Sequence, residues 1–160
     1  MQNLTIFTDA SHCPETKVGA GAFWSRTGEH FLKRAFALGN IDQSHKAELI
    51  TALTAITTCL DAPEYQQYFT PDAEKVLIIL VTDCLYVKQV LEGKVKADEQ
   101  YRDRIRGILN RLWIGGISIK VNHVKAHSGT GEPRKWVNTW CDREAKKIMR
   151  GLRGKARVAS

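Results

Sequence analysis

Hydrophobic and polar residues alternate through the first part of the chain, which is the period of half-buried β-strands. The alternation is interrupted by short polar or glycine-containing stretches. One of these, Thr27-Gly28, stands between two apolar runs and is a hairpin signal. We therefore predict three antiparallel strands over residues 4–11, 19–26 and 30–38, and these strands open the fold.

The spacing of apolar residues then changes to three and four, which is typical of an amphipathic helix. Asp42 or Ser44 is a suitable N-cap for this helix, and Pro63 ends it. The continuous apolar and β-branched run 76–82 predicts a central strand that is covered on both faces.

Helices and strands alternate in the second half of the chain. We predict a short helix over 84–91, an amphipathic helix over 99–113, a fifth strand over 117–124 and a closing helix from 135 to about 150. Glycines follow the first two of these helices, as is common where helices end. The order of elements predicts an α/β fold with a mixed sheet.

The length of 160 residues suits one domain with a sizeable core. We expect this domain to span 1–150 and residues 151–160 to form a basic, flexible C-terminal tail. The longest apolar run, 76–81, is far too short to cross a bilayer, so no membrane contact is expected. The four cysteines form no C-x-x-C pair, which argues against a zinc site or a disulfide framework and favours the cytoplasm.

The net charge is +7, and the positive excess gathers near the C-terminus. Against the single acid Glu144, the last eighteen residues carry Arg143, Lys146, Lys147, Arg150, Arg153, Lys155 and Arg157. Such a cluster favours a polyanionic partner, and nucleic acid is the simplest one. A solubilising tail is the alternative explanation for any one of these residues.

Four acidic residues lie in separate segments that can aim their side chains at one point: Asp9, Glu48, Asp83 and Asp142. Asp9 and Asp83 follow hydrophobic, β-branched runs, where an ionised carboxylate is costly unless a cation balances it. Carboxylate oxygens suit Mg²⁺ or Mn²⁺, and two such ions about 4 Å apart stabilise an in-line phosphoryl displacement. The four acids together therefore predict a metal-dependent nuclease.

Each of these residues has a simpler explanation when it is taken alone. Asp83 precedes a helix and could cap it, and Asp142 could pair with Arg143 or Lys146 on a helix surface. A loop histidine such as His127 is by itself more often incidental. Its position after a strand and before the helix of Asp142 favours a proton-transfer role near neutral pH.

The four tryptophans are less informative. Trp24 on a strand is expected in the core. Trp113, Trp136 and Trp140 are as consistent with core packing as with a platform for base stacking.

Five ordered motifs cover nearly the whole chain: Thr8-Asp9-x-Ser11, Lys46-Ala-Glu48-Leu49, Thr82-Asp83-x-x-Tyr86-Val87, Val124-Lys-x-His127-x-Gly129 and Asn138-x-x-Cys141-Asp142-x-x-Ala145. In these motifs the chain resembles the type 1 ribonuclease H family. The resemblance implies a ribonuclease H-like fold, with a five-stranded mixed sheet of three antiparallel and then two parallel strands, flanked by helices. It also implies an endonuclease that cuts the RNA strand of RNA/DNA hybrids with two Mg²⁺ ions and leaves 5'-phosphate and 3'-hydroxyl ends. Mn²⁺ is expected to substitute.

The same resemblance implies roles for individual residues. The catalytic metal ligands would be Asp9, Glu48, Asp83 and Asp142. His127 would assist product release or donate a proton. Contacts to the hybrid are expected from Ser11, Ser44, Lys46, Lys94 and Lys96. The chain is expected to act as a monomer.

Departures from the family pattern bear on substrate choice. Ala10 stands in place of a glycine, residues 12–17 replace a Gly- and Asn-rich loop, and a basic protrusion is cut to 93–97. Leu85 stands where a glutamine is frequent and removes a polar side chain that would meet base edges or 2'-hydroxyls, which distinguish RNA from DNA. Two alternatives therefore stay open. One is a nuclease of the same fold that acts on structured DNA or another RNA duplex, and the other is a non-catalytic hybrid-binding module.

Overall fold

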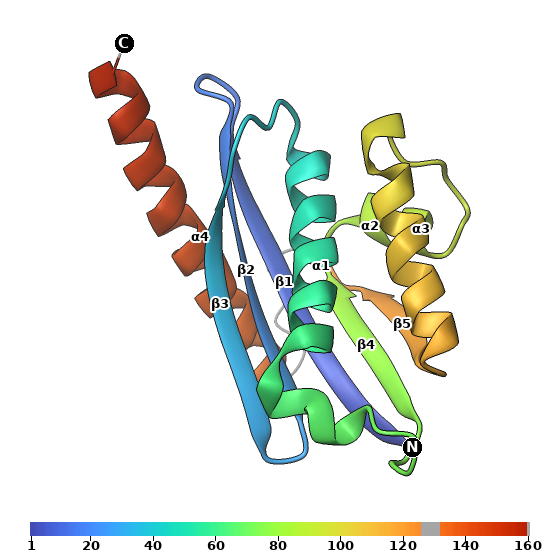
Figure 1. The fold of residues 1–160 in the computed structure, drawn as a ribbon. Helices are drawn as coiled ribbons and strands as arrows, with labels where there is room; N and C mark the ends of the chain where they lie inside the picture. The colour runs from blue at the N-terminus through green and yellow to red at the C-terminus, as the bar shows by residue number, and fades with distance from the viewer. Residues whose placement is uncertain (126–131, 160) are drawn as a thin grey trace.

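The computed structural model describes residues 1–125 and 132–159. Figure 1 shows the arrangement of the strands and helices in this part of the chain. In chain order they are β1 (Gln2–Cys13), β2 (Val18–Thr27), β3 (His30–Leu38), α1 (Ser44–Asp61), the 3-10 helix η1 (Pro63–Tyr68), β4 (Val76–Thr82), α2 (Leu85–Leu91), α3 (Glu99–Ile114), β5 (Ser118–His123) and α4 (Glu132–Ala159). All five predicted strands and all four predicted helices are present, and η1 was not predicted.

The five strands form one sheet in the order β3-β2-β1-β4-β5. β1 pairs antiparallel with β2, and β2 pairs antiparallel with β3. β4 is parallel to β1 on one side and to β5 on the other. The structure therefore confirms the predicted α/β fold with three antiparallel strands followed by two parallel strands.

Helices cover both faces of the sheet. Successive residues of a strand point to opposite sides, so one strand contributes side chains to the core on each face. Ile6 of β1 is buried in the larger core, which also contains buried residues of α1, α2 and α3. The next residue, Phe7, packs with Val137 and Cys141 of α4 on the other face. Figure 1 shows α1 crossing one face of the sheet while α4 lies on the other. Within the described residues, no helix combines the length and apolar character that crossing a membrane requires.

The start of α1 differs from the prediction. Its N-cap is Gln43, and no described side chain caps the helix, so the prediction of Asp42 or Ser44 as the cap was wrong. The Asp42 carboxylate instead accepts a hydrogen bond from Lys46 Nζ at 3.0 Å, and Ser44 is already the first helical residue.

The closing helix α4 is longer than predicted and runs through Ala159 instead of ending near residue 150. Residues 151–159 contain no proline and are mostly arginine, lysine, leucine and alanine, which favour the helix enough to offset two glycines. The domain boundary at residue 150 and the flexibility of residues 151–160 stay predictions.

Gly21 of β2 lies directly under α1. A Cβ at this position would overlap Thr51 Oγ1 and lie 2.8 Å from the Phe36 ring. Thr51 cannot move away easily, because it is buried and donates a hydrogen bond to the Ala47 carbonyl at 2.8 Å. Gly21→Ala is expected to push α1 away from the sheet and to lower the free energy of unfolding by about 1–3 kcal/mol. Urea unfolding beside Gly39→Ala, whose Cβ would meet no described atom within 4 Å, tests this, and equal losses in the two variants would contradict it.

Candidate active site

Two aspartates meet where the parallel pairing of the neighbouring strands β1 and β4 ends. The pairing of these strands ends at Phe7 and Val81, and Asp9 and Asp83 each follow two residues later. β1 continues to Cys13, whereas β4 stops at Thr82, so the edge of β1 opens beside Asp9. Open α/β sheets bind ligands beyond strand ends of this kind.

Glu48 reaches the same place from α1. It lies in the second turn of the helix, between Ala47 and Leu49, which are both fully buried. Ala47 also belongs to a buried cluster with Leu38 and Ile41, and Ala10, the residue that follows Asp9, packs against this cluster. This packing fixes α1 over the end of β1, so the Glu48 side chain points toward Asp9.

The three carboxylates form one compact group. Asp9, Glu48 and Asp83 each offer a ligand oxygen, and these oxygens all lie within 4.8 Å of one another. Each of the three residues is partly buried. Hard carboxylate oxygens gathered in this way are the usual ligands of Mg²⁺ and Mn²⁺.

Burial dominates the electrostatics of this group. Burial first, and then the nearby charges of Asp83 and Asp142, raise the pKa of Asp9 to about 7. The pKa of Glu48 is also well above its usual range, because of burial first and then the charges of Asp9 and Asp83. Closely spaced carboxylates that lose water in this way favour a bound cation or a retained proton.

Few protein hydrogen-bond donors stabilise the ionised forms of these buried carboxylates. The backbone N–H of Ala10 donates to Asp9 Oδ1 at 2.9 Å. Glu48 Oε2 is buried and has no hydrogen-bond partner in the part of the chain that the structure describes. A buried oxygen without a donor beside two other carboxylates fits a divalent metal, which supplies the missing positive charge.

Asp142 is near this group but outside the compact set of three. Its Oδ2 forms an ion pair with Lys146 Nζ at 2.8 Å, one turn along α4. The surface pairing considered from sequence therefore occurs. The charge of Asp142 nevertheless raises the pKa values of Asp9 and Glu48, so Asp142 lies close enough to affect their ionisation.

Comparison with known proteins agrees with this geometry. A family model described as RNase H matches residues 1–150. The chain belongs to the RNase H family. Among solved structures, the RNase H1 from the halophilic archaeon Halobacterium salinarum NRC-1 is similar in fold, with 16% sequence identity, a TM-score of 0.63, and coverage of 91% of this chain and 96% of that chain. No curated protein sequence matches this RNase H chain.

His127, predicted as an auxiliary catalytic group, lies outside the described residues. Of the predicted substrate contacts in this RNase H chain, Ser11 lies on β1 two residues after Asp9 and is partly exposed. Ser44 is exposed at the start of α1. Ser11 lies on the strand that carries Asp9 and Ser44 on the helix that carries Glu48, and their contact with substrate stays a prediction.

The predicted lysine contacts differ in their surroundings. Lys94 is exposed and pairs with Glu92 at 3.1 Å. Lys96 lines an apolar groove of about 670 Å³ between α2 and α3, together with Ile105 and Arg102. Both lysines follow α2, on the side of the RNase H fold that the shortened loop 93–97 occupies. Their role in binding the hybrid stays a prediction.

A polar cluster near the start of α1 was not found from the sequence. Lys46 Nζ lies 3.0 Å from Asp42 Oδ1 and 3.7 Å from Asp98 Oδ2, so two acids already share its charge. His45 lies 3.8 Å from the same Asp98 oxygen, and its ring meets the edge of Tyr86 with centroids 4.6 Å apart. The cluster ties α1 to α2 and to the start of α3, and it thereby positions the helix that carries Glu48. Asp98 carries no sequence signal for this role, because it lies in a loop far along the chain.

Proposed function

We propose that this RNase H family member cuts the RNA strand of RNA/DNA hybrids and leaves 5'-phosphate and 3'-hydroxyl ends. The observation that carries the proposal is the group of Asp9, Glu48 and Asp83, in a chain whose residues 1–150 match the family. A module that only bound anionic phosphates would gain nothing from three partly buried carboxylates, because like charges repel. The group therefore favours a nuclease over a non-catalytic hybrid-binding module.

Asp9, Glu48 and Asp83 would hold the metal, and Mg²⁺ is proposed, with Mn²⁺ as a substitute. A bound divalent ion would stabilise charge on the phosphoryl oxygens and lower the pKa of an attacking water. The three carboxylates would orient this chemistry from rigid elements, because Asp9 lies within β1, Asp83 directly follows β4 and Glu48 lies in the second turn of α1. Because the pKa of Asp9 is about 7 without metal, metal binding is expected to displace a proton and to strengthen as the pH rises.

Asp142 and His127 are proposed as auxiliary groups. Asp142 would help to hold a second metal ion, and its Oδ2 is paired with Lys146 Nζ in this structure. The ion pair is partly exposed, with 46% of the Lys146 side chain accessible, so breaking it costs little. His127 is proposed to assist product release or to donate a proton to the leaving oxygen.

Leu85 favours a second candidate substrate. Its side chain is 48% exposed at the first residue of α2, two residues after Asp83. An apolar group here makes no hydrogen bond to a 2'-hydroxyl, so RNA and DNA strands would be distinguished less strictly. The second candidate is therefore a nuclease of the same fold that acts on structured DNA or an RNA duplex.

Cleavage of matched labelled duplexes tests the proposal. RNA/DNA, RNA/RNA, DNA/DNA and a four-way DNA junction would be incubated with Mg²⁺, with Mn²⁺ and with chelator. We expect cutting of the RNA in the hybrid alone, lost with chelator. Leu85→Gln is expected to raise the preference for the hybrid by up to about tenfold, the effect of one added hydrogen bond. Cutting of the junction or of RNA/RNA in preference to the hybrid would establish the second candidate, and no cutting of any duplex would overturn both.

We also propose that the protein acts as a monomer and that residues 1–150 form its catalytic domain. The complete group of three carboxylates comes from a single copy of the chain, which supports this proposal. Light scattering in the presence and absence of hybrid would test it, and a dimer in both conditions would contradict it.

A further inference from the structure

Aromatic rings from three elements gather on the face of the sheet that carries α4. Trp24 of β2 stacks on Phe31 of β3, with ring centroids 6.5 Å apart and 17° between the ring planes. The Lys33 ammonium lies 5.7 Å from the centroid of Phe31 and 5.4 Å from that of Trp140 in α4. Trp136 precedes Trp140 by one helical turn and so lies on the same face of α4. These five residues are called the aromatic track below.

The outer rings of the track are not part of the core. The side chain of Phe31 is 58% exposed and that of Trp136 is 59% exposed. The floor beneath them is fixed, because Trp24 packs on Phe7, whose centroid is 6.1 Å away and which is buried. The track is therefore a rigid platform of aromatic rings with exposed outer edges, and Trp24 is partly buried and packs against the core as expected.

Positive charge continues the track along α4. Arg143 and Lys147 follow Trp136 and Trp140 at spacings of three and four, so all four lie on one stripe of the helix. Both cations are exposed. Glu144 lies beside this stripe, and its single negative charge balances only one of the two positive charges.

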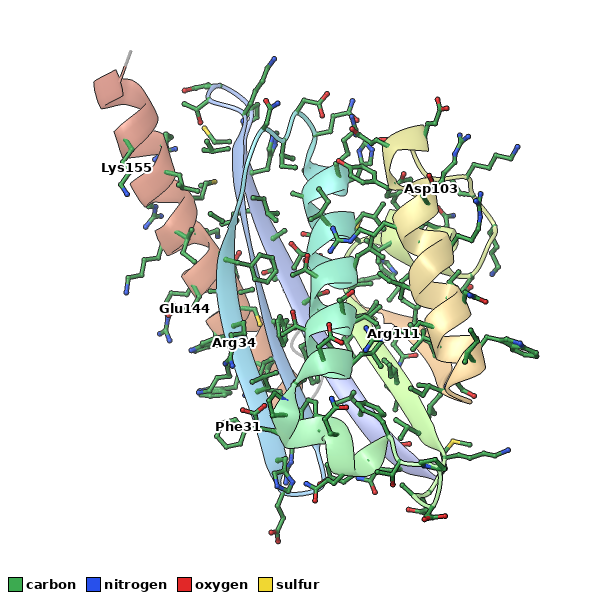
Figure 2. The ribbon with its side chains drawn as sticks, viewed as in Figure 1. Phe31, Arg34, Asp103, Arg111, Glu144 and Lys155 are labelled. Atoms are coloured by element: carbon green, nitrogen blue, oxygen red, sulfur yellow. The ribbon has the colours of Figure 1, made fainter. Side chains whose placement is uncertain are left out.

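The other end of the track is also basic. Arg26 is the register partner of Phe31, and the two side chains share one face of the sheet. In Figure 2, Phe31 of β3 lies on the same side of the molecule as Glu144 and Lys155 of α4. Rings and cations thus follow one path from the β2–β3 hairpin along α4.

We propose that the aromatic track binds single-stranded nucleic acid. Bases of any sequence stack on aromatic rings, and interleaved cations hold the phosphates, so this ligand matches both features of the surface. An acidic peptide would match the cations but leave the rings unused. A second copy of this chain would bring the two sets of cations together, which like charges oppose. The site is separate from the carboxylate group and goes beyond hybrid cleavage.

Fluorescence anisotropy with a labelled oligothymidylate of about twenty nucleotides, in chelator, tests the proposal without depending on cleavage. Phe31→Ala and Trp136→Ala are each expected to weaken binding about tenfold. Trp113→Ala is the matched control, because that indole is 84% exposed at the end of α3, and its affinity is expected to equal that of the wild type. Phe31→Tyr and Trp136→Phe keep a ring and are expected to keep binding within about threefold.

Three outcomes would overturn the proposal. The first is an unchanged affinity in the double variant Phe31→Ala/Trp136→Ala, with thermal unfolding showing that it is folded. The second is equal affinity of the wild type for oligoglutamate of the same charge, since charge alone would then explain binding. The third is concentration-dependent dimerisation of the wild type that the double variant loses, because the track would then join two copies.

Discussion

Asp9→Asn is expected to lower the rate of hybrid cleavage by on the order of a thousandfold while hybrid binding in Mg²⁺ stays the same or tightens. Asp9 lies between Glu48 and Asp83, and its oxygen is within 4.8 Å of theirs, so it can share any metal that they bind. Asparagine keeps the size of the side chain but removes the charge that a metal needs. The same change lowers the repulsion between the site and a phosphate backbone, which is why binding should not weaken.

Single-turnover cleavage and anisotropy with uncut hybrid would measure the two effects separately. Asp103→Asn is the matched control, because it removes the same charge from an exposed position on α3, where Asp103 pairs with Arg106 at 3.3 Å. Figure 2 shows Asp103 on α3, and Figure 1 shows this helix on the β4–β5 side of the sheet. Cleavage by Asp9→Asn at more than a tenth of the wild-type rate would exclude Asp9 as an essential ligand.

Without metal, the contribution of Asp9 to the free energy of unfolding is expected to fall as the pH rises from about 4 to about 7. The pKa of this carboxyl is about 7 in the folded protein, against 3.8 for an aspartate that is exposed to water in the unfolded chain. Between about pH 4 and pH 7 the carboxyl of Asp9 stays protonated in the folded state but is ionised in the unfolded state. Raising the pH in this range therefore stabilises the unfolded state and lowers the free energy of unfolding. The full loss is at most about 4 kcal/mol, and below pH 4 both states are protonated and no further change occurs.

Urea unfolding in chelator at pH 4 and pH 8 would test this expectation. Asp9→Asn has no proton to lose, so it should match the wild type at pH 4 and exceed its stability at pH 8. Mg²⁺ at pH 8 should then stabilise the wild type more than the variant, because a metal that binds only the folded state raises the free energy of unfolding. Parallel stability profiles for the two proteins between pH 4 and pH 8 would show that Asp9 is not held in a desolvated, repulsive group.

The sheet was predictable because its strands carry strong local patterns. The apolar, β-branched run Val76–Thr82 is bounded by polar residues, and the strand has those bounds. The hairpin signal at Thr27-Gly28 predicted where β3 begins. Gly28 adopts a φ of +56° in this turn, a conformation that favours glycine. Two acids of the site followed from these elements, because Asp9 and Asp83 each lie two residues beyond the last paired residues of β1 and β4.

Contacts between distant segments could not be predicted in the same way. The ion pair between Lys146 and Asp142 depends on how α4 packs against the sheet, which no local pattern of the helix determines. Asp98 joins His45 and Lys46 through a loop that has no pattern of its own. The stacking of Trp24 on Phe31 depends on strand register, which is set by pairing across the whole hairpin.

The parallel pairing of β1 with β4 also means that the group of carboxylates forms only after a distant segment of the chain has been synthesised. A growing chain that has emerged only through α1 contains the β1–β2–β3 meander, Asp9 and Glu48, but it lacks the strand that carries Asp83. Local hairpins fold early, whereas a parallel pair must wait for a distant segment. A translation product that ends before β4 therefore lacks Asp83, and its group of carboxylates is incomplete.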